Sequence, residues 1–470
     1  MSPGDFQHVY SLPTSGTRSQ TVAIVNPYGA PTIASDLRKF SSQFGLPQCT
    51  TSSGCLRVLN EAGGSSGLPA ANGDWPAEAA LGVETVHGIC NSCHIILIEA
   101  SSATISDLTA SVDTAARLGA NEISISFVTS ESFDDSFWAP HYNHPGVVIV
   151  AASGDHGYDA APAFPASLPT VVAAGGTSLE LTGNGSYRSE SVWNSSGMAP
   201  GSGCSSLFAA PPWQATDAAG AGCGAHRAVS DVSADADPVT GAAVYTATPI
   251  PGQSGETGWF QIGGTSLSAP LIAGVFALAG GTPRDVSPAA TLYARHSMLH
   301  DVTSGSNGQC GGTAICEARL GYDGPTGLGT PNGLGAFYPP GAAPMALDPH
   351  HPGVSLAPAR IRTSSSASLH LSLLNRNPFR VNGSVSLESV ARLHYPTSHS
   401  RAIIVSFGRR TFHLGARGAT TTTFTLSPNL RSLVARLRQI KLAATIEVSD
   451  AAGHRGAVRA QLALDYVPPR

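Results

Sequence analysis

Residues 263–270 (Gly-Gly-Thr-Ser-Leu-Ser-Ala-Pro) combine a flexible turn with hydroxyl side chains, and an apolar run, 271–279, follows directly. A glycine pair allows a tight backbone turn, and the next residues are expected to open a buried helix. The Ser266 hydroxyl would then stand at a helix N-terminus, where backbone N–H groups favour negative charge. Such a serine suits nucleophilic attack on a carbonyl group. A glycine-rich turn in which the serine only caps the helix is the alternative.

A serine nucleophile needs a base, and this sequence favours a carboxylate. The first apolar strand ends in Val25-Asn26-Pro27, so the aspartate of a subtilisin-type Ser-His-Asp site is missing. Glu78 lies in a predicted helix for which Asp74 is the expected N-cap and Pro76 stands in the first turn. A carboxylate whose pKa is raised by partial burial or by a neighbouring acid can accept the serine proton, best at low pH.

Asp155 is the second candidate acid. It stands in the turn Ser153-Gly154-Asp155-His156-Gly157, which follows the apolar run 146–151. Ligands of parallel α/β sheets bind at the carboxyl ends of the strands. We expect Asp155 to face the nucleophile as a protonated acid that donates to the oxyanion. Capping of its own loop by the side chain is the alternative.

Short apolar strands alternate with amphipathic helices around these residues. Near-continuous apolar strands between helices indicate a parallel sheet that is covered on both faces, so the first domain, residues 1–338, is predicted to be α/β. The predicted strands are 21–25, 95–100, 123–127, 146–151 and 171–174, and the predicted helices are 33–44, 76–88 and 106–118.

The composition changes beyond about residue 339. Proline-rich stretches at 339–341 and 349–352 indicate a linker over 339–355. Residues 356–470 carry alternating or β-branched runs and few helix signals, which predicts an accessory antiparallel β-sandwich of the immunoglobulin-like type. Its clearest strand candidates are 368–374, 402–407, 420–426 and 443–448.

Charge also divides the chain. The 470 residues are 42% hydrophobic and only 12% charged, which fits a secreted protein better than a charge-rich cytosolic enzyme. Residues 1–340 carry 10 basic and 26 acidic side chains, whereas residues 341–470 carry 16 basic and 5 acidic ones. Such a split argues for two domains with different surroundings. We hypothesise that the basic C-terminal domain contacts a cell surface and that the acidic, weakly charged body tolerates low pH.

The eight cysteines fall into close pairs within the first domain. An even count at short intervals predicts four local disulfides in an oxidising compartment, although Cys90-Asn91-Ser92-Cys93 has a redox or zinc motif as its alternative. The start of the chain is polar and lacks the features of a signal peptide, so we expect a secreted protein whose signal peptide is not in this chain. No apolar run approaches about 18 residues, which predicts no membrane span. The expected pairs are Cys49–Cys55, Cys90–Cys93, Cys204–Cys223 and Cys310–Cys316.

The candidate residues together resemble the sedolisin (serine-carboxyl) peptidases, which are subtilisin-fold enzymes that use Ser, Glu and Asp. Glu78 on a helix, Ser-Gly-Asp155 after a strand and Gly-Gly-Thr-Ser266-x-Ser-x-Pro occur in the order of that family. The resemblance implies a subtilisin-like doubly wound parallel sheet and a secreted endopeptidase with an acidic optimum. Ser266 would attack, Glu78 would take its proton and Asp155 would support the oxyanion. Further matching motifs lie at 173–178, 201–205, 231–238 and 321–331, so the resemblance spans about residues 5–340.

Two departures from the family pattern bear on activity. Gly82 stands where the family has a second acid, on the same helix face as Glu78, so Glu78 loses its expected partner unless a water takes the vacated space. Glu84 points about 240° away on a helix and cannot easily substitute. Ile125 and Val128 stand where relatives usually have Asn and Gly, which leaves substrate specificity open. A weak or inactive pseudopeptidase that binds peptides or a surface is therefore the alternative. A third interpretation is that the C-terminal domain is the functional part of the protein, as an adhesion or wall-binding module.

The resemblance also implies one calcium ion after the nucleophile helix. Its ligands would be the carboxylates of Asp301 and Asp323 and the carbonyls of Val302, Arg319 and Gly321, completed by water to about six oxygens. A pair of turn-capping aspartates is the alternative. The expected partner is a protein or peptide substrate, with no nucleic acid, and the protein is expected to be a monomer.

Overall fold

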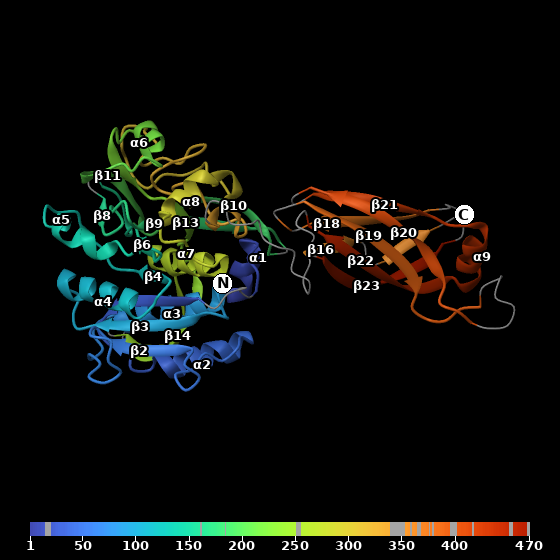
Figure 1. Ribbon diagram of the computed structural model, residues 1–470, viewed down its shortest axis with the longest axis horizontal. Coiled ribbons are helices and arrows are strands. Elements are labelled where there is room, and N and C mark those ends of the chain that lie inside the picture. The colour runs from blue at the N-terminus through green and yellow to red at the C-terminus, as the bar shows by residue number, and fades with distance from the viewer. Residues whose placement is uncertain are drawn as a thin grey trace. The chain divides into compact units, whose positions relative to one another are not determined.

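The chain divides into two compact units, Met1–Ala342 and Ala343–Arg470, in a computed structural model (Figure 1). The predicted linker 339–355 lies largely outside the described residues, so the predicted domain boundaries stay a prediction. The structure describes residues 1–470 apart from 15–19, 160–161, 184, 251–254, 339–352, 358–359, 364–367, 376, 378–379, 395–401, 416–417, 451–454 and 468–470.

A parallel sheet forms the centre of the first unit. Its strands run in the order β10-β9-β6-β4-β1-β3-β2, with β13 paired to β9 off this path. All pairs are parallel except β10–β9. The strands are β1 (Thr21–Pro27), β2 (Leu56–Asn60), β3 (His94–Ala100), β4 (Glu122–Ile125), β6 (Val148–Ala152), β9 (Val172–Leu181), β10 (Tyr187–Val192) and β13 (Val232–Asp235).

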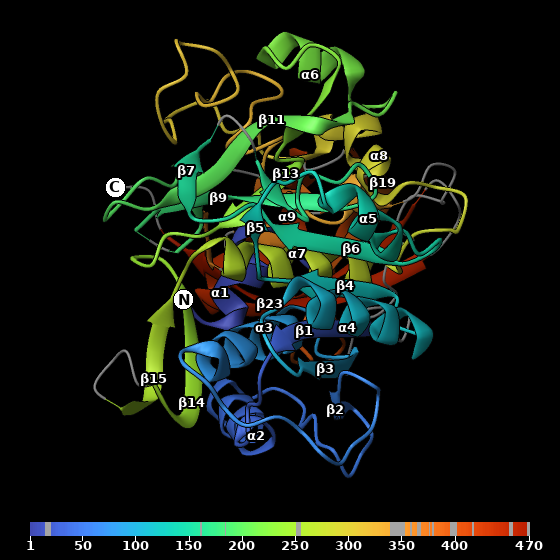
Figure 2. The same cartoon turned by 90° about the vertical axis from the view of Figure 1, so that its left-hand side faces the viewer.

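Helices cover both faces of this sheet. Successive side chains of a strand point to opposite faces, and β1 follows this rule. Ala23 and Val25 pack with Leu108 and Val112 of α4 (Ile105–Arg117), whereas Ile24 points to α3 (Trp75–Ile89) on the other face. Helix α7 (Thr265–Ala279) packs beside α3 and against β4, β6 and β9 (Figure 2). The face that carries α3 and α7 is therefore the one on which the candidate site is built.

Smaller elements surround this core. The hairpin of β14 (Ala242–Ile250) and β15 (Glu256–Ile262) packs on α3 and α2 (Ile33–Phe44). The remaining helices are α1 (Pro3–Val9), α5 (Asp135–Trp138), α6 (Ala215–Ala221), α8 (Pro288–Ala294) and the 3-10 helices η1 (Ala139–Tyr142), η3 (His296–Met298) and η4 (Gly335–Phe337). The remaining strands are β5 (Thr129–Ser130), β7 (His156–Tyr158), β8 (Ala163–Phe164), β11 (Ala199–Ala209) and β12 (His226–Val229).

The expected α/β fold is confirmed, with shifts at element ends. Predicted helix 33–44 matches α2, and the other two predicted helices differ by one residue at each end. The strand predicted at 123–127 ends at Ile125, because residues 126–128 leave the sheet before β5. Strand β2 and the hairpin β14–β15 were not predicted, since their polar or glycine-flanked sequences carry weak apolar signals.

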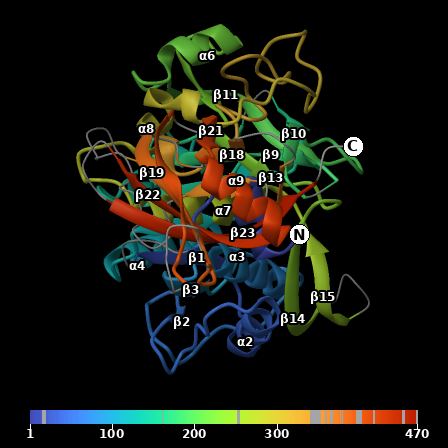
Figure 3. The ribbon, with the colours of Figure 1, turned by 90° about the vertical axis from the view of Figure 1, so that its right-hand side faces the viewer.

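The second unit is built of two β-sheets that share one core, which confirms the predicted sandwich (Figures 1 and 3). Leu369, Leu371 and Leu373 from one sheet pack with Val385 and Leu387 from the other. The parallel pairing of β17 with β23 is an exception to an antiparallel pattern, and the structure leaves the immunoglobulin-like assignment a prediction. The elements are β16 (Val354–Ala357), β18 (Ser368–Asn375) and β21 (Ala419–Thr425) in one sheet, β17 (Arg360–Thr363), β23 (Arg455–Tyr466), β22 (Gln439–Ser449), β19 (Val381–Ser389) and β20 (Ser406–Leu414) in the other, and helix α9 (Pro428–Leu437).

All four predicted disulfides are present, and the described residues include no free cysteine. The Cys90–Cys93 pair is therefore a disulfide in this structure and not a zinc or dithiol motif. None of the helices in the described ranges has the length and apolar character that crossing a membrane requires.

Candidate active site

The predicted nucleophile stands where the sequence places it. Ser266 is the second residue of α7 and is half-buried. Gly264 is the N-cap with φ +87°, a conformation that favours glycine, and a Cβ atom there would lie 2.8 Å from Asp155 Oδ2. Glycine is thus required at position 264 both by its backbone angle and by the close approach of Asp155.

Asp155 is fixed to the N-terminus of the nucleophile helix. It lies in the turn between β6 and β7, and its Oδ1 accepts hydrogen bonds from Thr265 N at 2.8 Å and from Thr265 Oγ1 at 2.7 Å. The backbone N–H of Gly154 in turn donates to Thr265 Oγ1 at 3.2 Å. These bonds join the carboxyl end of β6 to the first turn of α7, so Asp155 and Ser266 hold a fixed relation to each other.

Glu78 faces the nucleophile from α3. Its Oε1 atom is buried and has no hydrogen-bond partner among the described residues. Burial raises the pKa of the Glu78 carboxyl to about 7, the Ser266 and Ser126 hydroxyls act to lower it, and the charge of Asp155 adds to the rise. Asp74 occupies the N-cap position of α3 as predicted, but its side chain makes no capping hydrogen bond.

These contacts bring Glu78, Asp155 and Ser266 together from α3, from the β6–β7 turn and from α7. A hydroxyl at a helix N-terminus, beside a buried carboxylate with a pKa near neutrality, is a nucleophile–base pair. The acid that is fixed to the same helix terminus is suited to interact with an oxyanion. The chemistry to which this arrangement is suited is acyl transfer by a serine.

The position of the absent second acid is filled by an apolar side chain. A Cβ atom at Gly82 would lie 2.9 Å from Ile24 Cγ2, because α3 approaches β1 closely at this residue. Ile24 therefore occupies the space next to the helix backbone into which a side chain at position 82 would have to extend. The proximity of position 24 to position 82 could not be recognised from the sequence.

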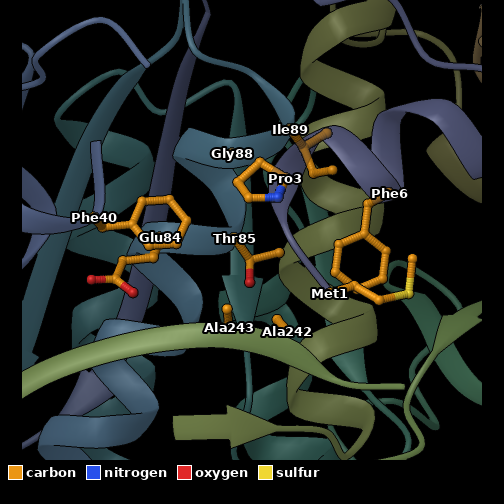
Figure 4. A pocket seen from close by; sticks show the side chains of 10 residues that line it. All are labelled: Met1, Pro3, Phe6, Phe40, Glu84, Thr85, Gly88, Ile89, Ala242 and Ala243. Atoms are coloured by element: carbon orange, nitrogen blue, oxygen red, sulfur yellow. The ribbon is translucent and has the colours of Figure 1, made fainter. Parts of the chain in front are cut away.

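As predicted, Glu84 does not replace the missing acid. Its Oε2 accepts a hydrogen bond from Tyr245 N of β14 at 2.8 Å, so the side chain points to the hairpin. Figure 4 shows Glu84 in a small pocket together with Phe40 of α2, Thr85 of α3 and Ala243 of β14. Burial raises the pKa of Glu84 well above its ordinary value.

The two departures from the family pattern, Ile125 at the end of β4 and Val128 just after it, have different surroundings. Ile125 is fully buried in the core between the sheet and α4. Val128 lies beside the aspartate turn, since a Cβ atom at Gly154 would be 3.6 Å from Val128 Cγ2. Of the two, Val128 is therefore the one next to the candidate site.

The expected calcium ligands lie in one loop region. Asp301 Oδ2 accepts a hydrogen bond from Gly321 N at 2.9 Å, and Asp323 Oδ2 accepts one from Arg319 N at 3.2 Å. Burial raises the pKa of Asp323 to about 8, and the nearby charge of Asp301 contributes. Within the described ranges no three His, Cys, Asp or Glu side chains converge as a metal group. Two neighbouring carboxylates fit a calcium ion only if backbone carbonyls and water complete its shell.

Comparison with known proteins agrees with the fold. No known family model matches the chain. It is 29% identical over 364 residues to sedolisin from Pseudomonas sp. (strain 101), which covers 70% of this chain and 59% of that protein. It is 36% identical over 205 residues to kumamolisin from Bacillus sp. (strain MN-32), which covers 40% of this chain and 35% of that protein. The chain thus spans well under two thirds of the length of these relatives.

A solved structure gives the same picture. The complex of Pseudomonas sedolisin, a serine-carboxyl proteinase, with two molecules of pseudo-iodotyrostatin aligns with a TM-score of 0.59 and 26% identity, and covers 70% of this chain and 95% of that chain. The first unit therefore has a subtilisin-like α/β fold. The sequence and structural similarities together support its placement in the sedolisin family.

Sequence reasoning missed three residues of the site, Ile24, Ser126 and Thr265. Ser126 directly follows β4, and its Oγ donates to the backbone oxygen of Ser266 at 3.4 Å. A signal existed for Ser126, because a hydroxyl at the carboxyl end of a central strand lies at the edge where ligands bind.

Proposed function

We propose that the first unit is a secreted serine-carboxyl endopeptidase, which cleaves proteins or peptides with Ser266 as its nucleophile. The observation that carries this proposal is that Ser266 stands at the N-terminus of α7, which Asp155 holds through Thr265, while Glu78 on α3 presents a buried carboxyl oxygen without a hydrogen-bond partner among the described residues. The effect of the Ser266 hydroxyl on the pKa of Glu78 agrees with this arrangement. The names of the relatives and the solved sedolisin support the same class of reaction. Four disulfides support an oxidising, extracellular location.

In this proposal Ser266 Oγ attacks the carbonyl carbon of the scissile peptide bond while Glu78 accepts the hydroxyl proton. The negative charge that develops on the carbonyl oxygen is stabilised by Asp155, which donates a hydrogen bond in its protonated form. Glu78 then returns its proton to the leaving amine, and water attacks the acyl-enzyme in the second half of the reaction.

The pKa of Glu78 bears on the working pH. Its carboxyl must be ionised to act as a base, and a pKa of about 7 leaves most of it protonated in acid. This favours an optimum closer to neutrality than the acidic optimum expected from the sequence. Asp155 opposes this trend, because its donor role requires the protonated acid.

We further propose that one calcium ion binds at Asp301 and Asp323, with carbonyls of Val302, Arg319 and Gly321 as the other protein ligands. When bound, the ion would supply structural charge neutralisation between two carboxylates and no chemistry at Ser266. The hydrogen bonds of Gly321 and Arg319 to the two aspartates already hold this loop together and leave its main chain close to both carboxylates.

Covalent labelling tests the nucleophile directly. The protein would be treated with a fluorophosphonate and with a peptide aldehyde between pH 3 and 9, and the modified residue identified by mass spectrometry. We expect modification at Ser266 alone, loss of labelling in Ser266→Ala, and at least about a hundredfold slower labelling in Glu78→Gln. Ser268→Ala changes the buried hydroxyl two residues on in the same helix, where the side chain instead accepts from Ala234 N, and it should still be labelled. Labelling that survives Ser266→Ala contradicts the proposal.

The second candidate function is a pseudopeptidase that binds peptides without cleaving them. Ile24 in the space of the second acid is the observation that favours it. A parent protein that binds a peptide aldehyde reversibly, yet neither forms a fluorophosphonate adduct nor cleaves any peptide from pH 3 to 9, would support this function over the first.

The role of the C-terminal unit rests on charge. We propose that its excess of arginine contacts an anionic cell surface, since residues 341–470 carry 16 basic and 5 acidic side chains. Removal of this unit should abolish sedimentation with cell envelopes at low salt and leave peptide cleavage intact.

A further inference from the structure

The carbonyl group of the nucleophile has lost its helical hydrogen bond. In an α-helix the carbonyl of one residue accepts from the N–H four residues on, and for Ser266 that residue is Pro270, which lies inside α7. Proline has no N–H to donate. The Ser126 hydroxyl donates to this oxygen instead, at 3.4 Å, and so links the end of β4 to the first turn of α7.

The same hydroxyl also acts on the base. The Ser126 side chain interacts with Glu78 and acts to lower the pKa of that carboxyl, against the effect of burial. Ser126 is half-buried and its hydroxyl donates to the Ser266 carbonyl in this structure, while the Glu78 carboxyl is the second acceptor on which it acts. A serine hydroxyl has one proton to donate. Because hydrogen bonds to a charged acceptor are the stronger ones, the proton is drawn to Glu78 when Glu78 is ionised and to the carbonyl when Glu78 is neutral.

The elements around Glu78 leave few other partners. On its own helix, position 82 is a glycine, and β1 presents the apolar Ile24 to that position. The Asn26 amide is engaged by backbone oxygens of Pro27 and Trp75. The charged group that acts on Glu78 is Asp155 from the β6–β7 turn, and it raises the pKa of Glu78. Ser126 and Ser266 are thus the groups that favour the ionised base.

We propose that Ser126 is a positioning residue of this site: it holds the Glu78 carboxylate against Ser266 and so replaces the second acid that Ile24 excludes. This inference rests on the proposed function, in which Glu78 is the base for Ser266. Pro270 contributes to this arrangement because it has no N–H. The Ser266 carbonyl is therefore available to accept from the Ser126 hydroxyl when Glu78 is protonated.

Three variants test this role. Ser126→Ala removes the hydroxyl, Ser126→Thr retains it on a side chain suited to extended backbone, and Ser124→Ala removes a buried serine two residues earlier in β4 as the matched control. We would measure kcat/KM for a peptide substrate from pH 3 to 9. Ser126→Ala should lose about 10- to 100-fold, mainly in kcat, as expected for the loss of a hydrogen bond to a charged group. The acidic limb of its pH profile should move to higher pH. Ser126→Thr should restore both kcat/KM and the position of this limb, and Ser124→Ala should match the parent.

A second measurement separates this inference from the proposed function. The titration of Glu78 would be followed by carboxyl carbon NMR in parent, Ser126→Ala and Ser124→Ala. A higher pKa for Glu78 in Ser126→Ala alone supports the inference even if the parent cleaves nothing, in which case the proposed function is what fails. An unchanged Glu78 titration and an unchanged pH profile in Ser126→Ala overturn the inference, while labelling of Ser266 would leave the proposed function standing. Equal effects of Ser124→Ala and Ser126→Ala would also overturn it.

Discussion

Ile24 lies so close to Gly82 that a Cβ atom at position 82 would be 2.9 Å from Ile24 Cγ2. Real Cβ atoms do not approach other carbon atoms so closely, and Cγ2 is attached to the stiff branched carbon of isoleucine. Helix α3 therefore packs against β1 at a distance that only glycine permits. The absence of an acid at position 82 and the presence of isoleucine at position 24 are one structural feature, which leaves Glu78 without an acid one turn further along its helix.

Restoring the acid should require both positions to change. Gly82→Asp alone should lower the free energy of unfolding by about 1–3 kcal/mol, because the new side chain overpacks the contact with Ile24. Removal of a helix-interior glycine should offset less than about 1 kcal/mol of this loss. In the Ile24→Ala background, where the space is open, Gly82→Asp should raise kcat/KM at pH 4–5 at least about tenfold, since orienting a base is worth that much. Urea denaturation and peptide cleavage measure the two effects.

Gly82→Ala is the matched control for this pair. It has the same steric demand at Cβ but no carboxylate, so it should destabilise the parent in the same way. If Ile24→Ala/Gly82→Ala gains as much activity as Ile24→Ala/Gly82→Asp, then the gain comes from packing and not from the acid.

Asp155 should respond differently to amide and alanine substitutions. Asp155→Asn keeps an acceptor for the Thr265 N–H and Oγ1 hydroxyl and an amide donor for the oxyanion, whereas Asp155→Ala removes all of these. We expect Asp155→Ala to lose about 10²–10³ in kcat, the range for removal of one oxyanion donor, and Asp155→Asn to lose less. Because an amide donates at every pH, Asp155→Asn should also retain more of its activity on the alkaline side. Equal losses at all pH values would show that Asp155 only supports the loop.

Stability should fall as the pH rises from about 5 to 8. Burial raises the pKa values of Glu84, Glu122 and Glu190 in the folded protein above those of the unfolded chain. A carboxyl of this kind stabilises the folded state fully below its unfolded pKa, about 4.3, and this contribution is lost progressively as the pH rises toward the folded value. Urea unfolding at fixed calcium and ionic strength should therefore give a larger free energy of unfolding at pH 5 than at pH 8.

Glu122 offers the sharpest single test of this pH dependence. Both of its carboxylate oxygens are buried without a hydrogen-bond partner among the described residues. Glu122→Gln cannot ionise, so the loss of stability between pH 5 and pH 8 should be smaller than in the parent. Glu180→Gln, at an exposed site paired with Arg188, should leave the slope unchanged. A parent that is equally stable at both pH values would refute the prediction.

Chelation should destabilise the first unit. A calcium ion between Asp301 and Asp323 would bind the folded state only and would stabilise it by linkage. Millimolar calcium should therefore raise the Tm above that in excess chelator, and the difference should vanish in Asp323→Asn. Magnesium at the same concentration is the control, since it prefers octahedral sites with several waters. Identical melting curves in calcium and in chelator would contradict the proposal that calcium binds at this site.

Local sequence was sufficient for much of this molecule. Apolar runs and amphipathic spacing predicted five of the parallel strands (β1, β3, β4, β6 and β9) and the helices α2, α3 and α4, because strand and helix periodicities are determined by neighbouring residues. Short cysteine intervals predicted all four disulfides, since chain connectivity already holds each pair close. The glycine pair before Ser266 predicted a helix N-terminus by backbone conformation alone. Even the orientation of Glu84 away from the site followed from helix geometry.

The tertiary structure decided what surrounds each of these side chains. Ile24 and Gly82 are separated by 58 positions in the chain, and only the packing of α3 on β1 shows that one excludes an acid at the other. Ser126 donates to the Ser266 carbonyl, which has no helical donor because Pro270 of α7 lacks an N–H. Periodicity fixes the face of a helix or strand on which a residue lies, but it does not specify the opposing element or its distance. The environment of Glu78, the proposed base, is set by that distance, and therefore by the fold as a whole.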